Sequence, residues 1–251
     1  MTLFRRLFLA AVVAGVLSGT AASVVQQVTT VPLILEAERY ETVPEPVAAP
    51  VNPAEHAGAH ASAQAASTHG GHSHAAPAPA ADTSAEEVFQ RVGLTVATNL
   101  LVGVAYGLLL AGAMLLVGAP VDARRGLIWG AGGFIAFALA PAVGLPPELP
   151  GMGGAALEAR QAWWIAAALC AAGGLLALGF ARNRFVIAAG VVVAALPHLI
   201  GAPHPESPEG VVPAEMAARF AVLSIGVAAL FWAALGSVCG ALMQRVISPR
   251  G

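Results

Sequence analysis

The sequence predicts an all-α polytopic membrane protein with six transmembrane helices, and three observations lead to this fold class. First, 57% of the 251 residues are hydrophobic and only 10% are charged, whereas a soluble domain carries about a quarter charged residues. Second, the apolar residues gather in runs of about 20, the length that a helix needs to cross a bilayer. Third, most charged residues lie between these runs.

Six stretches of the sequence meet this length requirement. They are residues 7–28, 92–117, 126–144, 162–180, 185–201 and 220–243. The fifth is the shortest and carries Pro197 near its end. The first begins like a signal peptide, with Arg5 and Arg6 before an apolar core. Its apolar residues continue beyond the candidate cleavage site, and we interpret it as a retained helix that acts as a signal anchor.

The chain divides into three parts: a first helix over 1–35, a histidine-rich segment over 36–88, and a five-helix bundle over 89–251. The middle segment is rich in Ala, Pro, His and Glu and has almost no large apolar residues. Such a composition cannot bury enough surface to fold alone. We therefore expect this segment to be a disordered loop between the first two spans.

The arginines predict the orientation of the helices. All twelve basic residues are arginine, and with six spans they divide eight to four between the two sides. The larger group contains Arg5, Arg6, Arg124, Arg125, Arg182, Arg184, Arg245 and Arg250; the smaller contains Arg39, Arg91, Arg160 and Arg219. Short cytoplasmic loops carry the excess of basic residues. We therefore expect a bacterial inner-membrane protein with both termini in the cytoplasm and the histidine-rich loop in the periplasm.

The six spans also resemble three hairpins repeated in parallel. Each outward helix ends in a proline-containing stretch, as in 140–148 and 196–206, and each return helix opens with an acidic residue and an arginine, as in 158–160 and 215–219. Alanine-rich helices can resemble one another by chance, which is the alternative.

Glycines four residues apart predict close helix packing. These pairs are Gly15 with Gly19, Gly103 with Gly107, Gly126 with Gly130, and Gly236 with Gly240.

Five of the seven histidines lie in the predicted periplasmic loop, where they indicate metal capture. They are His56, His60, His69, His72 and His74. Imidazole suits divalent ions such as Co, Ni, Cu and Zn, and the usual affinity order favours Cu or Ni over Co. Selectivity must then arise elsewhere in the chain. The alternative is a solvated linker whose histidines bind no metal.

A second candidate metal site lies at the outer end of the fifth span. His198 and His204 stand among three prolines, and Glu206 follows. Proline frees backbone carbonyls, which can line a polar entrance. With Glu148 from the preceding hairpin, these residues form a nitrogen and oxygen ligand set. The alternative is a pair of interfacial histidines that reach toward the lipid headgroups.

Few polar residues lie within the spans, so those present are informative. Gln26 and Gln27 lie near the outer end of the first span, and Asn99 lies in the second. They are candidates for the lining of an ion path, and the alternative is hydrogen bonding between helices.

Cys170 and Cys239 lie in apolar runs and are expected to be packing residues, neither a disulfide nor a metal pair.

Several functional classes are disfavoured. There is no phosphate-binding glycine loop, no Ser/His/Asp set and no metalloprotease helix motif, so nothing supports an enzyme. No basic stripe is present, which disfavours a nucleic-acid partner. We expect no tightly bound cofactor.

Taken together, the motifs resemble the CbtA-type family of probable cobalt transporter subunits over nearly the whole chain. The resemblance rests on the segments 4–8, 26–36, 145–151, 158–164 and 196–205 and on the histidine-rich loop. Residues 82–87 depart from the tryptophan- and proline-rich segment expected there. The resemblance implies cobalt uptake linked to cobalamin synthesis, and a small one-helix partner of the B type.

The leading hypothesis is a membrane subunit for uptake of a divalent transition metal, with cobalt favoured and nickel and zinc as further candidates. The alternative is a non-transporting subunit that binds metal and delivers it to a partner transporter or stabilises that partner. The bilayer surrounds the chain in both hypotheses. A homo-oligomer is compatible with both.

Overall fold

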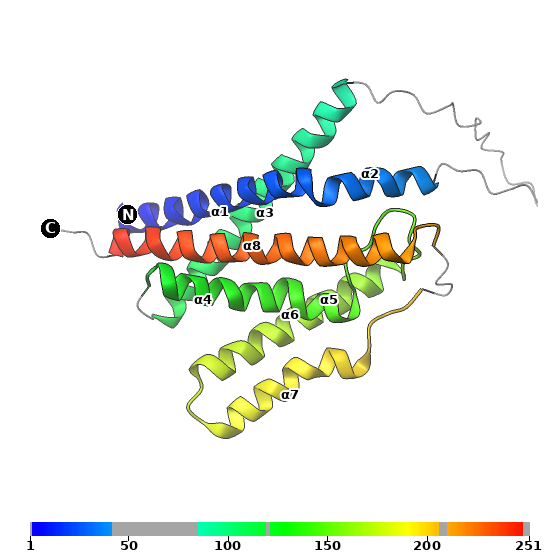
Figure 1. The fold of residues 1–251 in the computed structure, drawn as a ribbon. Helices are drawn as coiled ribbons and strands as arrows, with labels where there is room; N and C mark the ends of the chain where they lie inside the picture. The colour runs from blue at the N-terminus through cyan, green and yellow to red at the C-terminus, as the bar shows by residue number, and fades with distance from the viewer. Residues whose placement is uncertain (1, 42–84, 119–120, 206–209, 248–251) are drawn as a thin grey trace, which may run out of the picture.

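The computed structural model describes residues 2–41, 85–118, 121–205 and 210–247. Figure 1 shows a bundle of long helices joined by loops. Within the described residues, five helices are long and apolar enough to cross a membrane. A further apolar helix of 17 residues covers the fifth predicted span. The predicted fold class, an all-α polytopic membrane protein, is confirmed.

The chain begins with two helices that run almost end to end, α1 (Thr2–Val28) and α2 (Thr30–Glu41). The break at Thr29 precedes Pro32, which has no N–H to donate to the carbonyl of Val28. The chain resumes its helix at once because the α2 side chains find partners at the end of the bundle. Together, α1 and α2 form a nearly continuous helix that extends beyond the candidate membrane span Leu3–Val28.

Helix α2 continues to Glu41, whereas the sequence predicted a loop from residue 36 onward. Leu33 is buried in a small core with Leu149 and Phe220. Glu38 accepts hydrogen bonds from the guanidinium of Arg91 at 2.8 and 2.9 Å. These contacts keep the chain helical as far as Glu41, and the predicted disorder beyond it concerns residues 42–84, which lie outside the described residues.

The next part of the chain forms one long helix and one interrupted helix. They are α3 (Ala85–Val117), α4 (Ala123–Phe134), the π-helical turn η1 (Ile135–Leu139) and α5 (Ala140–Gly144). The carboxylate of Asp122 caps α4 by accepting from the backbone N–H of Arg125 at 2.9 Å. Pro141 has no N–H to continue the ladder, which accounts for the wider turn just before it.

The last three helices are α6 (Leu157–Phe180), α7 (Arg184–Ile200) and α8 (Ala214–Ile247). The side chain of Asn183 caps α7 by accepting from the backbone N–H of Phe185 at 2.8 Å. Gly201, at φ 92°, ends that helix, because a residue without a Cβ adopts positive φ without steric cost.

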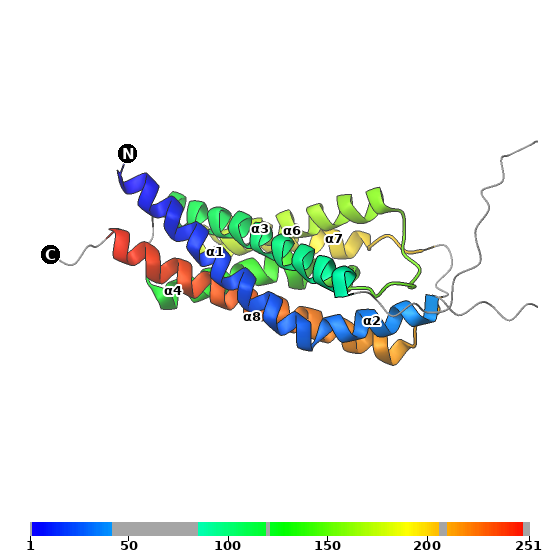
Figure 2. The ribbon, with the colours of Figure 1, turned by 90° about the horizontal axis from the view of Figure 1, so that it is seen from above.

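The bundle has two ends with different contents. The beginning of α1 and the end of α8 lie at the same end, which we call the terminal end (Figures 1 and 2). The opposite end contains α2, residues 145–156 and the segment that joins α7 to α8, and we call it the loop end. The five candidate spans and the shorter helix α7 alternate in direction between these ends, which is compatible with the six predicted spans.

Three helix pairs cross closely through glycine. α1 meets α3 at Gly15 and Gly103, and α4 meets α8 at Gly126 and Gly236, where a Cβ on either glycine would collide with the partner's backbone carbonyl. The second glycine of each predicted pair extends the same two crossings, so the predicted packing role of all four pairs is confirmed. α6 also meets α7 closely: a Cβ on Gly174 would collide with the carbonyl of Gly190, and a Cβ on Gly190 would collide with the side chain of Ala177.

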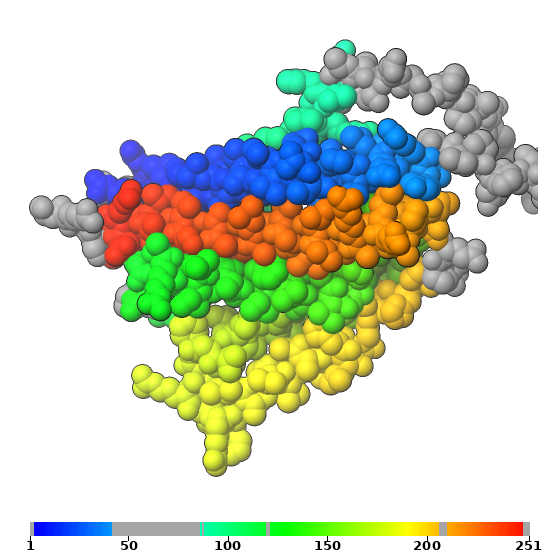
Figure 3. All heavy atoms as spheres, in the orientation of Figure 1, coloured from blue at the N-terminus to red at the C-terminus, as the bar shows by residue number. Residues whose placement is uncertain are grey.

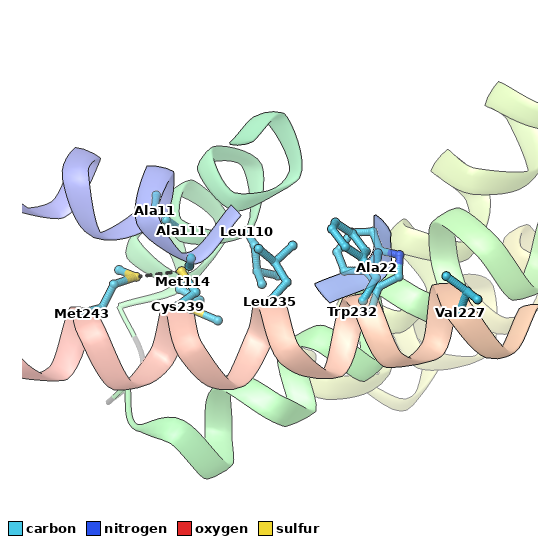
Figure 4. Packing of buried hydrophobic residues seen from close by; sticks show 12 residues of the cluster. Ala11, Ala22, Leu110, Ala111, Met114, Val227, Trp232, Leu235, Cys239 and Met243 are labelled. Carbon is cyan, nitrogen blue, oxygen red and sulfur yellow. Dashed lines mark hydrogen bonds between the residues drawn. The ribbon is translucent and has the colours of Figure 1, made fainter. Parts of the chain in front are cut away.

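Helix α8 forms the axis of the bundle. Figure 3 shows it between α1 and α2 on one side and α4 and α5 on the other, with α7 at the far margin. The main core lies where α8 meets α1 and α3, and α8 contributes Trp232 and Leu235 to it, among other residues (Figure 4). A smaller core at the loop end holds α2, residues 145–156 and the start of α8 together.

Candidate functional site

A groove of about 690 Å³ lies at the loop end of the bundle. It lies between η1, α5, the following loop, the start of α6 and the middle of α8. We call it the loop-end groove. Its polar side chains are Glu148, Arg160, Gln161 and Ser224. Phe137 and Trp164 contribute most of its aromatic surface, so the groove is apolar along its length and polar toward the loop.

An ion pair stands at the polar part of this groove. The Arg160 guanidinium donates to the Glu148 carboxylate at 2.6 Å, and the two side chains are only 32% and 23% exposed. The same guanidinium approaches the backbone of Gly154. Arg160 therefore holds the loop after α5 against α6. A metal ion that took the Glu148 carboxylate as a ligand would first have to displace this guanidinium.

The π-helical turn contributes Phe137 and Ala138 to the groove wall. Phe137 lies in this turn, and Pro141, four residues later, cannot donate an N–H to its carbonyl. Single π turns inside α-helices are frequently found at functional sites. The sequence analysis noted the proline but did not predict the turn, although a proline inside an apolar span is a recognisable indication of one.

His198 occupies the last turn of α7 and is held by α6. Its ring stands edge-on to Trp163, with 5.8 Å between the ring centroids. The indole N–H of Trp163 donates to the carbonyl oxygen of Pro197 at 3.2 Å. The Nδ1 atom of His198 is buried and has no hydrogen-bond partner among the described residues. This imidazole is therefore fixed in place while one of its nitrogens is unused.

The remaining predicted ligands are distributed differently. His204 is exposed in the segment after α7. Glu206 and the five histidines predicted to capture metal lie outside the described residues. Within the described ranges, no three His, Cys, Asp or Glu side chains come together as a metal site. The structure thus brings Glu148 to Arg160 and His198 to Trp163, in two separate contacts with the first turns of α6.

These features lie within the region that a protein-family comparison recognises. The model of the CbtA family, described as "Probable cobalt transporter subunit (CbtA)", matches residues 4–244. The chain belongs to the CbtA family. No curated protein and no solved structure matches it. Membership confirms the resemblance expected from the sequence, and identifies a multi-pass membrane protein that is a probable cobalt transporter subunit.

In this CbtA member, as in other bundles of apolar helices, polar groups within the spans need partners. The Asn99 amide of α3 donates to Gln26 Oε1 at 2.6 Å and to Ser23 Oγ at 3.0 Å, both on α1. Ser23 also donates to the backbone carbonyl of Gly19 at 2.9 Å. Gln27, the residue after Gln26, is half-buried. We call Ser23, Gln26 and Asn99 the amide network.

The amide network accounts for part of what the sequence predicted for this CbtA member. Gln26 and Asn99 were both candidates for an ion path or for hydrogen bonding between helices, and they are in direct contact. Ser23 was missed, although it lies one helical turn from Gln26 on α1 and so shares its face. The network joins α1 to α3 on the loop-end side of the crossing at Gly15 and Gly103.

Proposed function

We propose that this chain is the membrane subunit through which a divalent transition metal enters the cell, with cobalt as the cargo and cobalamin synthesis as its use. The observation that carries the proposal is the family match, which spans residues 4–244. That range includes the loop-end groove, His198 and the amide network. Nickel and zinc are further cargo candidates, because imidazole ligands accept several divalent ions.

The charge distribution supports an orientation with the loop end in the periplasm of a bacterial inner membrane. Seven described arginines belong to the terminal end: Arg5, Arg6, Arg124, Arg125, Arg182, Arg184 and Arg245. Four belong to the loop end: Arg39, Arg91, Arg160 and Arg219. Basic residues in short loops remain on the cytoplasmic side. Both termini are then cytoplasmic, and residues 42–84 are joined to the bundle on the outer side.

Metal capture is assigned to the five histidines of residues 56–74. Both helices that flank this segment, α2 and α3, meet it at the loop end. Several imidazoles close to the entrance raise the local concentration of ions. They are not the selective site, because histidines of this kind favour copper or nickel over cobalt.

Entry is assigned to His198 and His204, with Glu206 and Glu148 as oxygen ligands. The fixed ring and unused Nδ1 of His198 support this role. A ligand that is already held in place loses little conformational entropy when it binds. Glu148 joins the set only when its ion pair with Arg160 opens, so this carboxylate is a conditional ligand.

The amide network is assigned to the path below the entrance, with Gln27 beside it. One observation favours the alternative function, in which the chain binds metal and delivers it to a partner. Between the network and the terminal end, the core is apolar and closed: Leu110, Met114 and Leu235 are at most 3% exposed. Either a conformational change or a partner protein must complete a route across the membrane.

A flux measurement with the purified chain alone in vesicles separates these two functions. Vesicles loaded with a cobalt-sensitive dye report entry of the metal, and equilibrium binding to the same protein is measured in parallel. Binding with entry supports transport by this chain alone. Binding without entry supports the delivery function, and the absence of both contradicts the proposal.

A further inference from the structure

A cluster of three sulfur-containing side chains lies at the terminal end of the bundle, far from the groove. Met114 of α3 and Cys239 and Met243 of α8 are 1%, 0% and 0% exposed. The Cys239 thiol donates to the Met243 thioether at 3.7 Å. Figure 4 shows the three side chains close together, beside Ala11 and Ala111. We call them the sulfur cluster.

Three of the seven sulfur-containing residues in the sequence meet in this one place. The chain has five methionines and two cysteines, and the three members of this cluster share one apolar core. The neighbouring core positions are filled by alanine and leucine, which have no ligand atoms. Cys170, by contrast, is half-buried on α6 and provides an internal reference thiol.

The spacing of the sulfur atoms suits a metal ion. Two sulfur ligands at about 2.3 Å from one ion stand roughly 3.8–4.0 Å apart in tetrahedral or trigonal geometry. The observed Cys239–Met243 separation of 3.7 Å needs little adjustment to reach this range. Thioether side chains are flexible, so Met114 can complete the set.

The charge of the cluster selects the kind of ion. Binding removes the thiol proton, so that a monovalent ion and one thiolate have no net charge in an apolar core. A divalent ion would leave one uncompensated positive charge, which is costly to bury. Thiolate and thioether ligands also favour soft ions such as Cu(I). From these facts we propose that Met114, Cys239 and Met243 bind one soft monovalent ion of the Cu(I) or Ag(I) class.

The position of the cluster makes such a site reachable. Met114 lies one helical turn before the end of α3 at Val117, and Met243 lies one turn before the end of α8 at Ile247. One turn corresponds to about 5.4 Å along the axis. Loosening of these last turns opens the cluster to the terminal end. A bound ion would tie α3 to α8 there, so it should stabilise the bundle.

The test uses Ag(I) as the probe and the full-length chain carrying Cys170→Ser, in detergent. We expect one Ag(I) per chain, one proton released per ion, X-ray absorption with three sulfur neighbours, and a higher midpoint of thermal unfolding. Cys239→Ser should abolish binding. The double variant Met114→Leu and Met243→Leu should weaken it at least tenfold, and leucine keeps the volume close to that of methionine. Co(II) should not bind at these sulfurs.

Three results would overturn the proposal. The first is unchanged Ag(I) affinity in the methionine double variant, which would indicate an ordinary reactive thiol. The second is fewer than three sulfur neighbours around Ag(I) in the Cys170→Ser protein, a readout that needs no folded variant of the cluster. The third is Co(II) coordination by the same three sulfurs. The site does not rest on the proposed uptake function, so its failure leaves that function standing.

Discussion

Trp163 donates its indole N–H to the backbone carbonyl oxygen of Pro197 at 3.2 Å, and this bond joins the start of α6 to the end of α7. Helix α7 contacts the bundle mainly through α6. The bond therefore sets where the end of α7 lies. His198, the next residue after Pro197, is positioned by the same indole ring.

We predict that His198→Ala and His204→Ala each reduce uptake far more than His72→Ala. The His72 ring has four other histidines in its segment that can replace it. His198 is held against Trp163 and His204 stands between two prolines, and the described residues contain no other histidine. Uptake at limiting cobalt should fall roughly tenfold or more in each of the first two variants, equivalent to ~1.4 kcal/mol of binding. Rates are compared at equal amounts of protein in the membrane. Wild-type rates in both variants would remove this pair from the ion path.

Deletion of residues 55–74 should weaken uptake when cobalt is scarce and leave it unchanged when cobalt is abundant. The physical reason is that the five histidines raise the local ion concentration, which no longer limits the rate at saturating metal. Uptake is measured over a range of cobalt concentrations. The control is a variant in which residues 55–74 are replaced by a histidine-free segment of equal length. Loss of uptake at every concentration would make the segment a required ligand set.

Gly126→Ala should destabilise the bundle by roughly 1–3 kcal/mol, as expected when a packed contact is overfilled. A Cβ at Gly126 collides with the carbonyl of Gly236 on α8. Gly132→Ala on the same helix is the matched control, because no atom lies within 4 Å of its added Cβ. Thermal unfolding of the purified variants measures the difference. Equal midpoints for the two variants would argue against the close crossing of α4 and α8.

The proposed orientation predicts that a reporter fused at residue 80 is periplasmic and one fused at the C-terminus is cytoplasmic. The reason is the excess of arginine at the terminal end, where Arg5, Arg125 and Arg245 lie. Paired reporters that are active on only one side of the membrane make the measurement. A cytoplasmic reading at residue 80 would rule out the topology.

The spans could be predicted from the sequence because their apolar runs determine them locally. Residues 92–117 and 220–243 lie within α3 and α8, and only the helix ends project further. The polar contact between Gln26 and Asn99 was also within reach, since polar groups in a membrane seek one another.

What the sequence did not predict depends on contacts between distant segments. Glu38 lies in a stretch whose composition is typical of a loop, and its helix forms because Arg91 and the loop-end core are nearby. Glu148 and Arg160 were each noticed, but nothing in either motif indicated that they would pair. The pairing of α7 with α6 likewise depends on where Gly174 and Gly190 meet.

Cobalt accumulation in cells with and without this gene tests the central claim most directly. Cells are supplied with limiting radioactive cobalt, and accumulation of nickel and zinc is measured beside it. We expect cobalt accumulation to depend on the gene and to be reduced by His198→Ala. Equal cobalt accumulation with and without the gene, at a verified level of the protein in the membrane, would contradict it.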